Sequence, residues 1–234
     1  MDKRFWGIVA VVVVIMGAIF VINNNSGKTN TPSSSKNNSN QPTNHVEGQG
    51  ADGVTLLEYG DYECPYCGEF APIVKQVVAL YSQDIYFQFR NLPLTEIHPN
   101  AFAAARAAEA ASLQNKFWQM HDTLYESQSQ WVPASDPESY FIQYAQQLGL
   151  NVNKFKQAYV SSQVNDSITA DVNAFDATGT EEATPTFFLD GAQFTPQMTV
   201  SSFEQYINAA IKKKTGKASG IGASTTATSS SSAT

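Results

Sequence analysis

The two cysteines of this 234-residue chain, Cys64 and Cys67, are separated by only two residues in the stretch "LLEYGDYECPYCGEF". Two thiols at this spacing can bind a metal ion, close a structural disulfide, or exchange electrons as a reversible disulfide. Tetrahedral zinc needs four ligands, and the three histidines of the chain, His45, His98 and His121, do not form a closely spaced pair. A structural disulfide across so short a loop would restrict the unfolded chain very little. These considerations favour a redox pair.

The flanking sequence predicts which thiol reacts first. Residues 53–60, "GVTLLEYG", form a short run that favours a β-strand, and Pro65 opens a segment with apolar residues at helical spacing as far as Tyr81. Cys64 would then lie at a helix N-terminus, where free amide N–H groups and the helix dipole stabilise a thiolate. Cys67 would lie one turn inside the helix, shielded from most partners. We therefore predict Cys64 as the nucleophile and Cys67 as the resolving thiol.

The rest of the chain supplies the elements that must position this turn. Residues 84–94 alternate apolar and polar side chains, which predicts a second strand joined to the first by a right-handed parallel crossover. Helical patterns then fill an insertion of about 96–178. Residues 184–194 return to a β pattern broken by Asp190-Gly191, a hairpin signal, and a helix follows over about 201–214. The predicted class is α/β, in the order βαβ, helical insertion, ββα.

The two ends of the chain have different compositions. Lys3 and Arg4 precede an uncharged apolar run over 5–22, about 27 Å long as a helix at 1.5 Å per residue. We favour a membrane anchor over a cleaved signal peptide because no small-residue cleavage site follows. The positive-inside rule then leaves the N-terminus in the cytoplasm and the domain outside the cell membrane. Residues 23–50 and 215–234 are polar and low in apolar content, and we expect a disordered linker and tail.

The charge of the predicted domain excludes one class of partner. Residues 52–214 hold 19 acidic side chains against nine basic ones, and the whole chain has a formal net charge of −7. Such an acidic domain lacks the basic surface that binding to nucleic acid requires. Asp61, Glu63 and Glu69 lie close to the cysteines and are expected to oppose ionisation of Cys64, although screening would weaken exposed charges.

From about Val54 to Lys214 the chain resembles the DsbA-like thiol-disulfide oxidoreductases. The resemblance rests on "LLEYGDYECPYC", on "FRNLPL" with "HPNAFAAARAAEAA" close behind, on "KFWQMHDTLY", and on "GTEEATPTFFLDG". It implies a thioredoxin-like fold over 51–214 with an all-α inserted subdomain. Tyr66 departs from the Pro-His dipeptide of the strongly oxidising bacterial member and gives "CPYC", as in glutaredoxins, which leaves the redox strength open.

The resemblance also implies several site residues. Pro185 should be a cis-proline facing the cysteines, with Thr184 lining the site; Pro65 and Tyr66 complete the expected substrate-binding set. A proline peptide bond adopts cis at little cost and leaves neighbouring backbone groups free to pair with an extended substrate. Glu58, on the first strand, would be a buried acid that relays the proton of Cys67.

These features lead us to expect an extracytoplasmic enzyme that introduces disulfides into exported proteins through the cysteine pair. We expect reduced exported polypeptides as substrates, a quinone-linked membrane oxidoreductase for re-oxidation, a monomeric state, and neither a cofactor nor a metal beyond the two cysteines. Two alternatives stay open. The same fold could serve a disulfide reductase or isomerase, or the chain could be a non-catalytic polypeptide-binding or chaperone module with a vestigial CxxC. Arg90, His98 and His121 are expected to make structural contacts rather than to act in catalysis.

Overall fold

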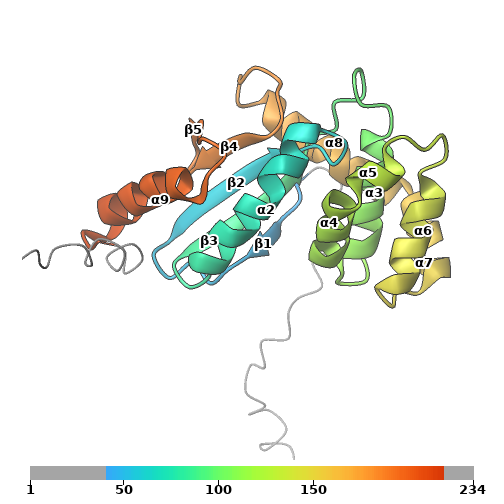
Figure 1. Ribbon diagram of the computed structural model, residues 1–234, viewed down its shortest axis with the longest axis horizontal. Coiled ribbons are helices and arrows are strands. Elements are labelled where there is room, and N and C mark those ends of the chain that lie inside the picture. The colour runs from blue at the N-terminus through green and yellow to red at the C-terminus, as the bar shows by residue number, and fades with distance from the viewer. Residues whose placement is uncertain (1–40, 219–234) are drawn as a thin grey trace, which may run out of the picture. The chain divides into compact units, whose positions relative to one another are not determined.

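A computed structural model of the chain describes residues 41–218, in which five strands form one mixed sheet in the order β1-β3-β2-β4-β5 (Figure 1). The strands are β1 (His45–Glu47), β2 (Val54–Gly60), β3 (Ile85–Asn91), β4 (Thr186–Leu189) and β5 (Ala192–Phe194). β2 and β3 are parallel, as the predicted crossover requires, and the other neighbouring pairs are antiparallel. Asp190 and Gly191 both have positive φ and join β4 to β5, which confirms the predicted hairpin.

Helices cover both faces of this sheet. α2 (Pro65–Leu80) and α9 (Val200–Thr215) contact each other on one face, and α8 (Ser162–Asp176) packs near β3 on the other. Alternation along β2 sends Leu56 and Glu58 towards the α2 face, whereas Tyr59 joins a smaller cluster with Phe175 of α8. Strand geometry therefore aims the carboxyl group of Glu58 at the helix that begins with the cysteines.

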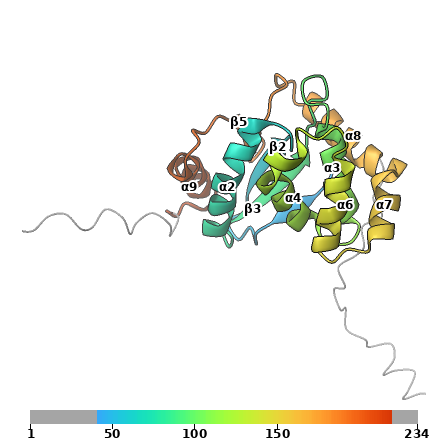
Figure 2. The ribbon, with the colours of Figure 1, turned by 45° about the vertical axis from the view of Figure 1, so that its right-hand side comes forward.

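The helical insertion matches the predicted all-α subdomain and lies between β3 and β4 in sequence. Apart from α8, its helices gather beside the sheet (Figure 2), and most alanines of α3 (Ala101–Ser112) are buried, which allows the neighbouring helices to approach closely. The helices are α3 (Ala101–Ser112), α4 (Phe117–Glu126), α5 (Gln128–Trp131), α6 (Glu138–Gln147), α7 (Val152–Tyr159) and α8. Together they span residues 101–176, inside the predicted range of 96–178.

One part of the predicted disordered linker is ordered. Residues 45–47 form edge strand β1 against β3, and Thr43 donates from its amide and its hydroxyl to Asp171, over 2.6 and 2.8 Å. The His45 ring contacts the Glu109 carboxylate at 2.8 Å and stacks on Phe117. The low apolar content of this segment predicted disorder, and that prediction is wrong here because buried polar contacts hold the segment in place.

The remaining predictions for the ends fall outside the described residues. The predicted anchor over 5–22 and residues 23–40 of the linker lie there, as does the tail from 219 onward. Within residues 41–218, no helix combines the length and the hydropathy needed to cross a membrane.

Candidate active site

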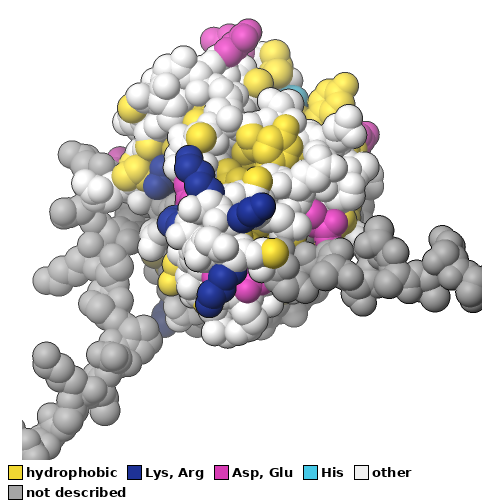
Figure 3. All heavy atoms as spheres, turned by 90° about the vertical axis from the view of Figure 1, so that its left-hand side faces the viewer, with side chains coloured by type: hydrophobic (Ala, Val, Ile, Leu, Met, Phe, Trp, Pro, Cys, Tyr) yellow, Lys and Arg dark blue, Asp and Glu magenta, His cyan; other side chains and the backbone are white. Residues whose placement is uncertain are grey.

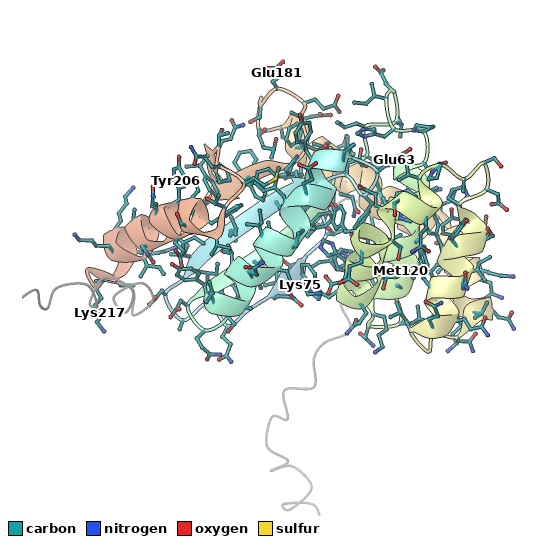
Figure 4. The ribbon with its side chains drawn as sticks, viewed as in Figure 1. Glu63, Lys75, Met120, Glu181, Tyr206 and Lys217 are labelled. Carbon is teal, nitrogen blue, oxygen red and sulfur yellow. The ribbon has the colours of Figure 1, made fainter. Side chains whose placement is uncertain are left out.

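The carboxyl ends of β2 and β3 reach the same edge of the sheet, and β4 begins there because it runs the opposite way. Three loops therefore meet at this edge: the one leading into Cys64, the one after Asn91, and the one ending at Pro185. Sites in open α/β sheets lie at the carboxyl ends of parallel strands for this reason. Figure 4 shows Glu63, at the start of α2, and Glu181, on the loop before β4, at the same end of the molecule.

Cys64 occupies the position immediately before the first turn of α2. Its backbone is extended (φ −64°, ψ 123°), Pro65 follows as the first helical residue, and the amide of Gly68 donates to the Cys64 carbonyl. The residue is 4% exposed, whereas Cys67 is fully buried and Tyr66 between them is 65% exposed. Both cysteines are reduced. The predicted placement of Cys64 at a helix start is confirmed, and Cys67 is shielded as predicted, although Cys64 is almost as covered.

The surroundings of Cys64 favour its thiolate. The pKa of Cys64 is lowered from 9.0 to about 6, and the largest cause is a hydrogen bond from the Cys67 side chain. Hydrogen bonds from the Thr184 side chain and from the amides of Cys67 and Tyr66 lower the pKa further, whereas burial raises it. A thiol with this pKa is mostly ionised at pH 7. Cys64 can therefore attack as a thiolate, and it is also a good leaving group.

Cys67 has the opposite electrostatic setting. Burial raises the pKa of Cys67 well above 9.0, and Cys64 and Glu58 raise it further. The amide of Asp61 donates to its sulfur over 3.5 Å, which only partly compensates. One thiol is thus ionised and the other stays protonated at neutral pH. This asymmetry is what the predicted roles of nucleophile and resolving thiol require.

The loop before β4 contributes the second wall of the site. The Thr184–Pro185 peptide bond is cis, as the resemblance implied, and the Cys64 sulfur lies 3.4 Å from the Thr184 carbonyl oxygen, to which its protonated form donates. The Thr184 hydroxyl is buried and has no hydrogen-bond partner among residues 41–218, so its hydrogen can turn towards a thiolate. Thr184 therefore touches Cys64 through both its backbone and its side chain.

Glu58 lies behind the resolving cysteine. The residue is 2% exposed, and burial raises the pKa of Glu58 from 4.5 to about 8, so its carboxyl group is mostly neutral at pH 7. Glu58 lines a cavity of about 330 Å³ between α2 and α4, together with Phe87, Trp118 and Tyr125. The Tyr125 hydroxyl is also buried without a partner among residues 41–218. A cavity of this size, with the Glu58 carboxyl group among its lining groups, has room for water molecules.

Asp61 has a role that the sequence did not reveal. Its carboxylate accepts from the amides of Glu63 and Leu94 and from the His98 ring, over 2.8, 2.9 and 2.7 Å. Asp61 and Glu63 are 1% and 6% exposed, so solvent screens their charges little, and neither is among the largest causes that shift the pKa of Cys64. These bonds fix the loop that carries Cys64 against the loop that follows β3. The sequence shows only that Asp61 lies close to the cysteines along the chain, which indicates proximity but not burial.

Gln128 is a second residue that sequence reasoning missed. It belongs to α5 of the helical insertion, and its amide nitrogen donates to the carbonyls of Tyr62 and Cys64, over 2.8 and 2.9 Å. The insertion therefore holds the backbone of the reactive turn directly. Gln128 follows Cys64 by 64 positions, and no motif in the sequence connects them.

The three residues expected to be structural make such contacts. The Arg90 guanidinium donates to the Tyr59 hydroxyl, and His98 pairs with Asp61. His121 is buried, with its ring 3.1 Å from the Tyr62 hydroxyl. Burial lowers the pKa of His121 to about 3, so its ring is neutral at physiological pH. Within residues 41–218, no group of three or more His, Cys, Asp or Glu side chains is placed to hold a metal ion.

Several solved structures share this architecture. A thioredoxin-like oxidoreductase from Silicibacter pomeroyi superposes with a TM-score of 0.61 at 24% identity, covering 74% of this chain and 95% of that one. BdbD from Bacillus subtilis gives 0.62 at 20% identity, covering 74% and 96%. The alpha-DsbA1 protein of Wolbachia pipientis gives 0.64 at 19% identity, covering 74% and 93%. These similarities confirm the predicted thioredoxin-like fold with a helical insertion.

Curated relatives match part of a longer chain. The Na(+)/H(+) antiporter NhaA 3 of Salinispora tropica is 40% identical over 147 residues, which are 63% of this chain and 22% of that protein. NhaA 1 of Salinispora arenicola is 35% identical over 167 residues, covering 71% and 24%. The present chain thus spans about a quarter of the length of these proteins. Residues 40–209 match the sequence model of the family described as Thioredoxin, and the chain belongs to that family.

Proposed function

We propose that this domain is a thiol-disulfide oxidoreductase, and that it acts as a dithiol oxidase on exported polypeptides. The observation that carries the proposal is the pairing of an ionised Cys64 with a buried, protonated Cys67 at the meeting point of three loops. Proteins of the same fold include the thiol-disulfide exchange protein alpha-DsbA2 of Wolbachia pipientis and the thiol-disulfide oxidoreductase MdbA of Actinomyces oris, which supports this reaction class. Antiport is not proposed, because the matched segment accounts for about a quarter of the antiporter chains.

The reaction begins with the oxidised enzyme. A substrate thiolate attacks the Cys64 sulfur, a mixed disulfide forms, and the Cys64–Cys67 bond breaks with Cys67 taking the electron pair. The nascent Cys67 thiolate is buried and basic, so it needs a proton, and the neutral Glu58 carboxyl group can supply one. A second substrate thiolate then attacks the substrate sulfur of the mixed disulfide. Cys64 leaves as a thiolate, and the substrate carries the new disulfide.

The pKa of Cys64 also bears on the direction of electron flow. Stabilising its thiolate stabilises the reduced enzyme, which makes the disulfide a stronger oxidant. Lowering this pKa from 9.0 to about 6 favours the reduced form at pH 7 by about 1.4 kcal/mol. For a two-electron couple that is on the order of 30 mV. The direction of this shift is the one that an oxidase requires.

Other parts of the proposal rest on the sequence. The predicted N-terminal anchor would hold the domain at the outer face of the cell membrane, near a quinone-linked oxidoreductase that restores the disulfide. Substrate would lie extended along the loop that ends at Pro185, pairing with free backbone groups there. The domain would act as a monomer and need no cofactor beyond its own cysteines.

Anaerobic mixing of the oxidised domain with a reduced two-cysteine peptide tests the function. The peptide should become oxidised at the rate at which the enzyme is reduced, and Cys64→Ser should abolish the reaction. Equilibration with glutathione gives the direction: a potential near about −120 mV indicates an oxidase, and one near about −270 mV a reductase. A polypeptide binder with a vestigial pair would bind the peptide equally well with Cys64→Ser, and that outcome would contradict the proposal.

A further inference from the structure

A hollow with a volume of about 430 Å³ lies beside the site, on the side of the loop that follows β3. Its wall is mostly apolar, and two glutamates, Glu96 and Glu182, also line it. The apolar part consists of Pro93, Leu94, Ile97, Phe102 and Val172, and Thr95 and Thr169 complete the wall. The mechanism above uses none of these residues.

Two contacts place the hollow close to the reacting sulfurs. Glu182 precedes Thr184 by two residues, and the Thr184 carbonyl lies 3.4 Å from the Cys64 sulfur. Two residues span at most about 7 Å of chain. On the other side, the Leu94 amide is bonded to the carboxylate of Asp61, whose own amide donates to the Cys67 sulfur. A peptide that reacts at Cys64 therefore passes within a few residues of the hollow.

The charged side chains that line the hollow are all acidic. Glu96 and Glu182 are exposed, and neither forms a hydrogen bond or ion pair with another residue of the described part of the chain. No lysine or arginine is among the residues that line the hollow. Figure 3 shows acidic side chains at the top of the visible face, the end that carries the Glu181 loop in Figure 4, and lower on this face acidic side chains lie among Lys and Arg.

An apolar wall combined with two free carboxylates fits one kind of side chain. Lysine and arginine bury a long methylene stem along apolar surface and keep a charged end at the edge. Ile97, which is 69% exposed, offers the stem an uncovered apolar surface, and the glutamates offer the charged end its partners. A neutral apolar side chain would leave both carboxylates without a partner, and an acidic one would be repelled.

We propose that this hollow binds a lysine or arginine side chain of the substrate polypeptide, two or three residues from its reacting cysteine. The inference rests on the proposed oxidase function and specifies its substrate class, namely segments with a basic residue next to the cysteine. Two partly solvated charge contacts should raise kcat/KM by about 3- to 10-fold over a neutral residue. Because both contacts are exposed, about 0.5 M salt should remove most of the preference.

The test uses the oxidised domain and peptides that differ only at the position three residues from one cysteine. The residues compared there are lysine, norleucine, glutamate and diaminopropionate. Diaminopropionate has the positive charge of lysine on a much shorter side chain. We expect kcat/KM to fall in the order lysine, norleucine, glutamate, with diaminopropionate below lysine. The Glu96→Gln/Glu182→Gln double variant should oxidise the lysine and norleucine peptides equally. Thr169→Trp, which fills the hollow, should have the same effect.

A matched control separates the hollow from general charge. Glu69→Gln/Glu181→Gln removes two exposed carboxylates near the same end of the molecule but outside the hollow, and it should keep the lysine preference. Equal kcat/KM for all four peptides with the wild-type domain would overturn the inference while leaving the oxidase function intact. Loss of the preference in the control variant would overturn it as well. Failure to oxidise any peptide would instead count against the function itself.

Discussion

Removing the Thr184 hydroxyl should weaken the oxidising power of the site by a calculable amount. This hydroxyl is buried, has no other partner within residues 41–218, and helps to lower the pKa of Cys64 to about 6. Loss of one hydrogen bond to a charged group costs about 1.5 kcal/mol, or roughly one pKa unit. Thr184→Val should therefore raise the pKa of Cys64 to about 7. The thiolate fraction at pH 7 would fall from about 90% to about half, which makes the disulfide roughly 20 mV less oxidising.

Ultraviolet absorbance of the thiolate, followed against pH in the reduced protein, measures this pKa directly. The glutathione equilibrium constant at pH 7 should change about 5-fold in the same variant. Thr184→Ser keeps the hydroxyl and should retain the low pKa, and Thr180→Val makes the same chemical change four residues earlier in the loop without affecting it. A pKa in Thr184→Val within about 0.3 units of wild type would refute the assignment of the hydroxyl as a donor.

Three further variants probe the groups around the pair. Burial raises the pKa of Glu58 from 4.5 to about 8, so ionising this carboxyl group destabilises the fold as pH rises above about 4.5. The free energy of unfolding of Glu58→Gln should therefore rise relative to wild type by on the order of 3–5 kcal/mol between pH 5 and pH 8. A difference in unfolding free energy that does not change with pH would contradict this. Gln128→Ala should lower the free energy of unfolding by about 1–2 kcal/mol in urea titrations, whereas the exposed Gln130→Ala should leave it unchanged. Asp171→Ala should remove hydrogen-exchange protection from Thr43 without changing the thiolate absorbance, and retained protection would show that other contacts hold the segment.

Local sequence patterns predict the framework of the site. The β-favouring run before Cys64 and the proline after it predict a strand, a turn and a helix start, because each signal acts within a few residues. Asp190-Gly191 predicts the hairpin on the same basis. The cis peptide before Pro185 is implied by the resemblance, since a proline alone does not determine its isomer.

Contacts between distant residues escaped prediction. The sequence places Asp61 close to the cysteines, but only the fold brings it to the Leu94 amide and the His98 ring. Gln128 reaches the Cys64 carbonyl from a different subdomain. Thr43 and Asp171 are 128 positions apart, and their hydrogen bonds order a segment whose composition predicts disorder. Polar side chains acquire such roles through burial and geometry, which hydrophobic periodicity does not encode.

The proposed mechanism requires the two thiols of one short turn to ionise at very different pH. Alkylation of the reduced protein with a small reagent from pH 4 to 10, with each cysteine quantified by mass spectrometry, measures both ionisations in one experiment. We expect Cys64 to be labelled with a midpoint near pH 6 and Cys67 to stay unlabelled through pH 9. Equal labelling of the two cysteines, or a Cys64 midpoint near pH 9, would contradict it.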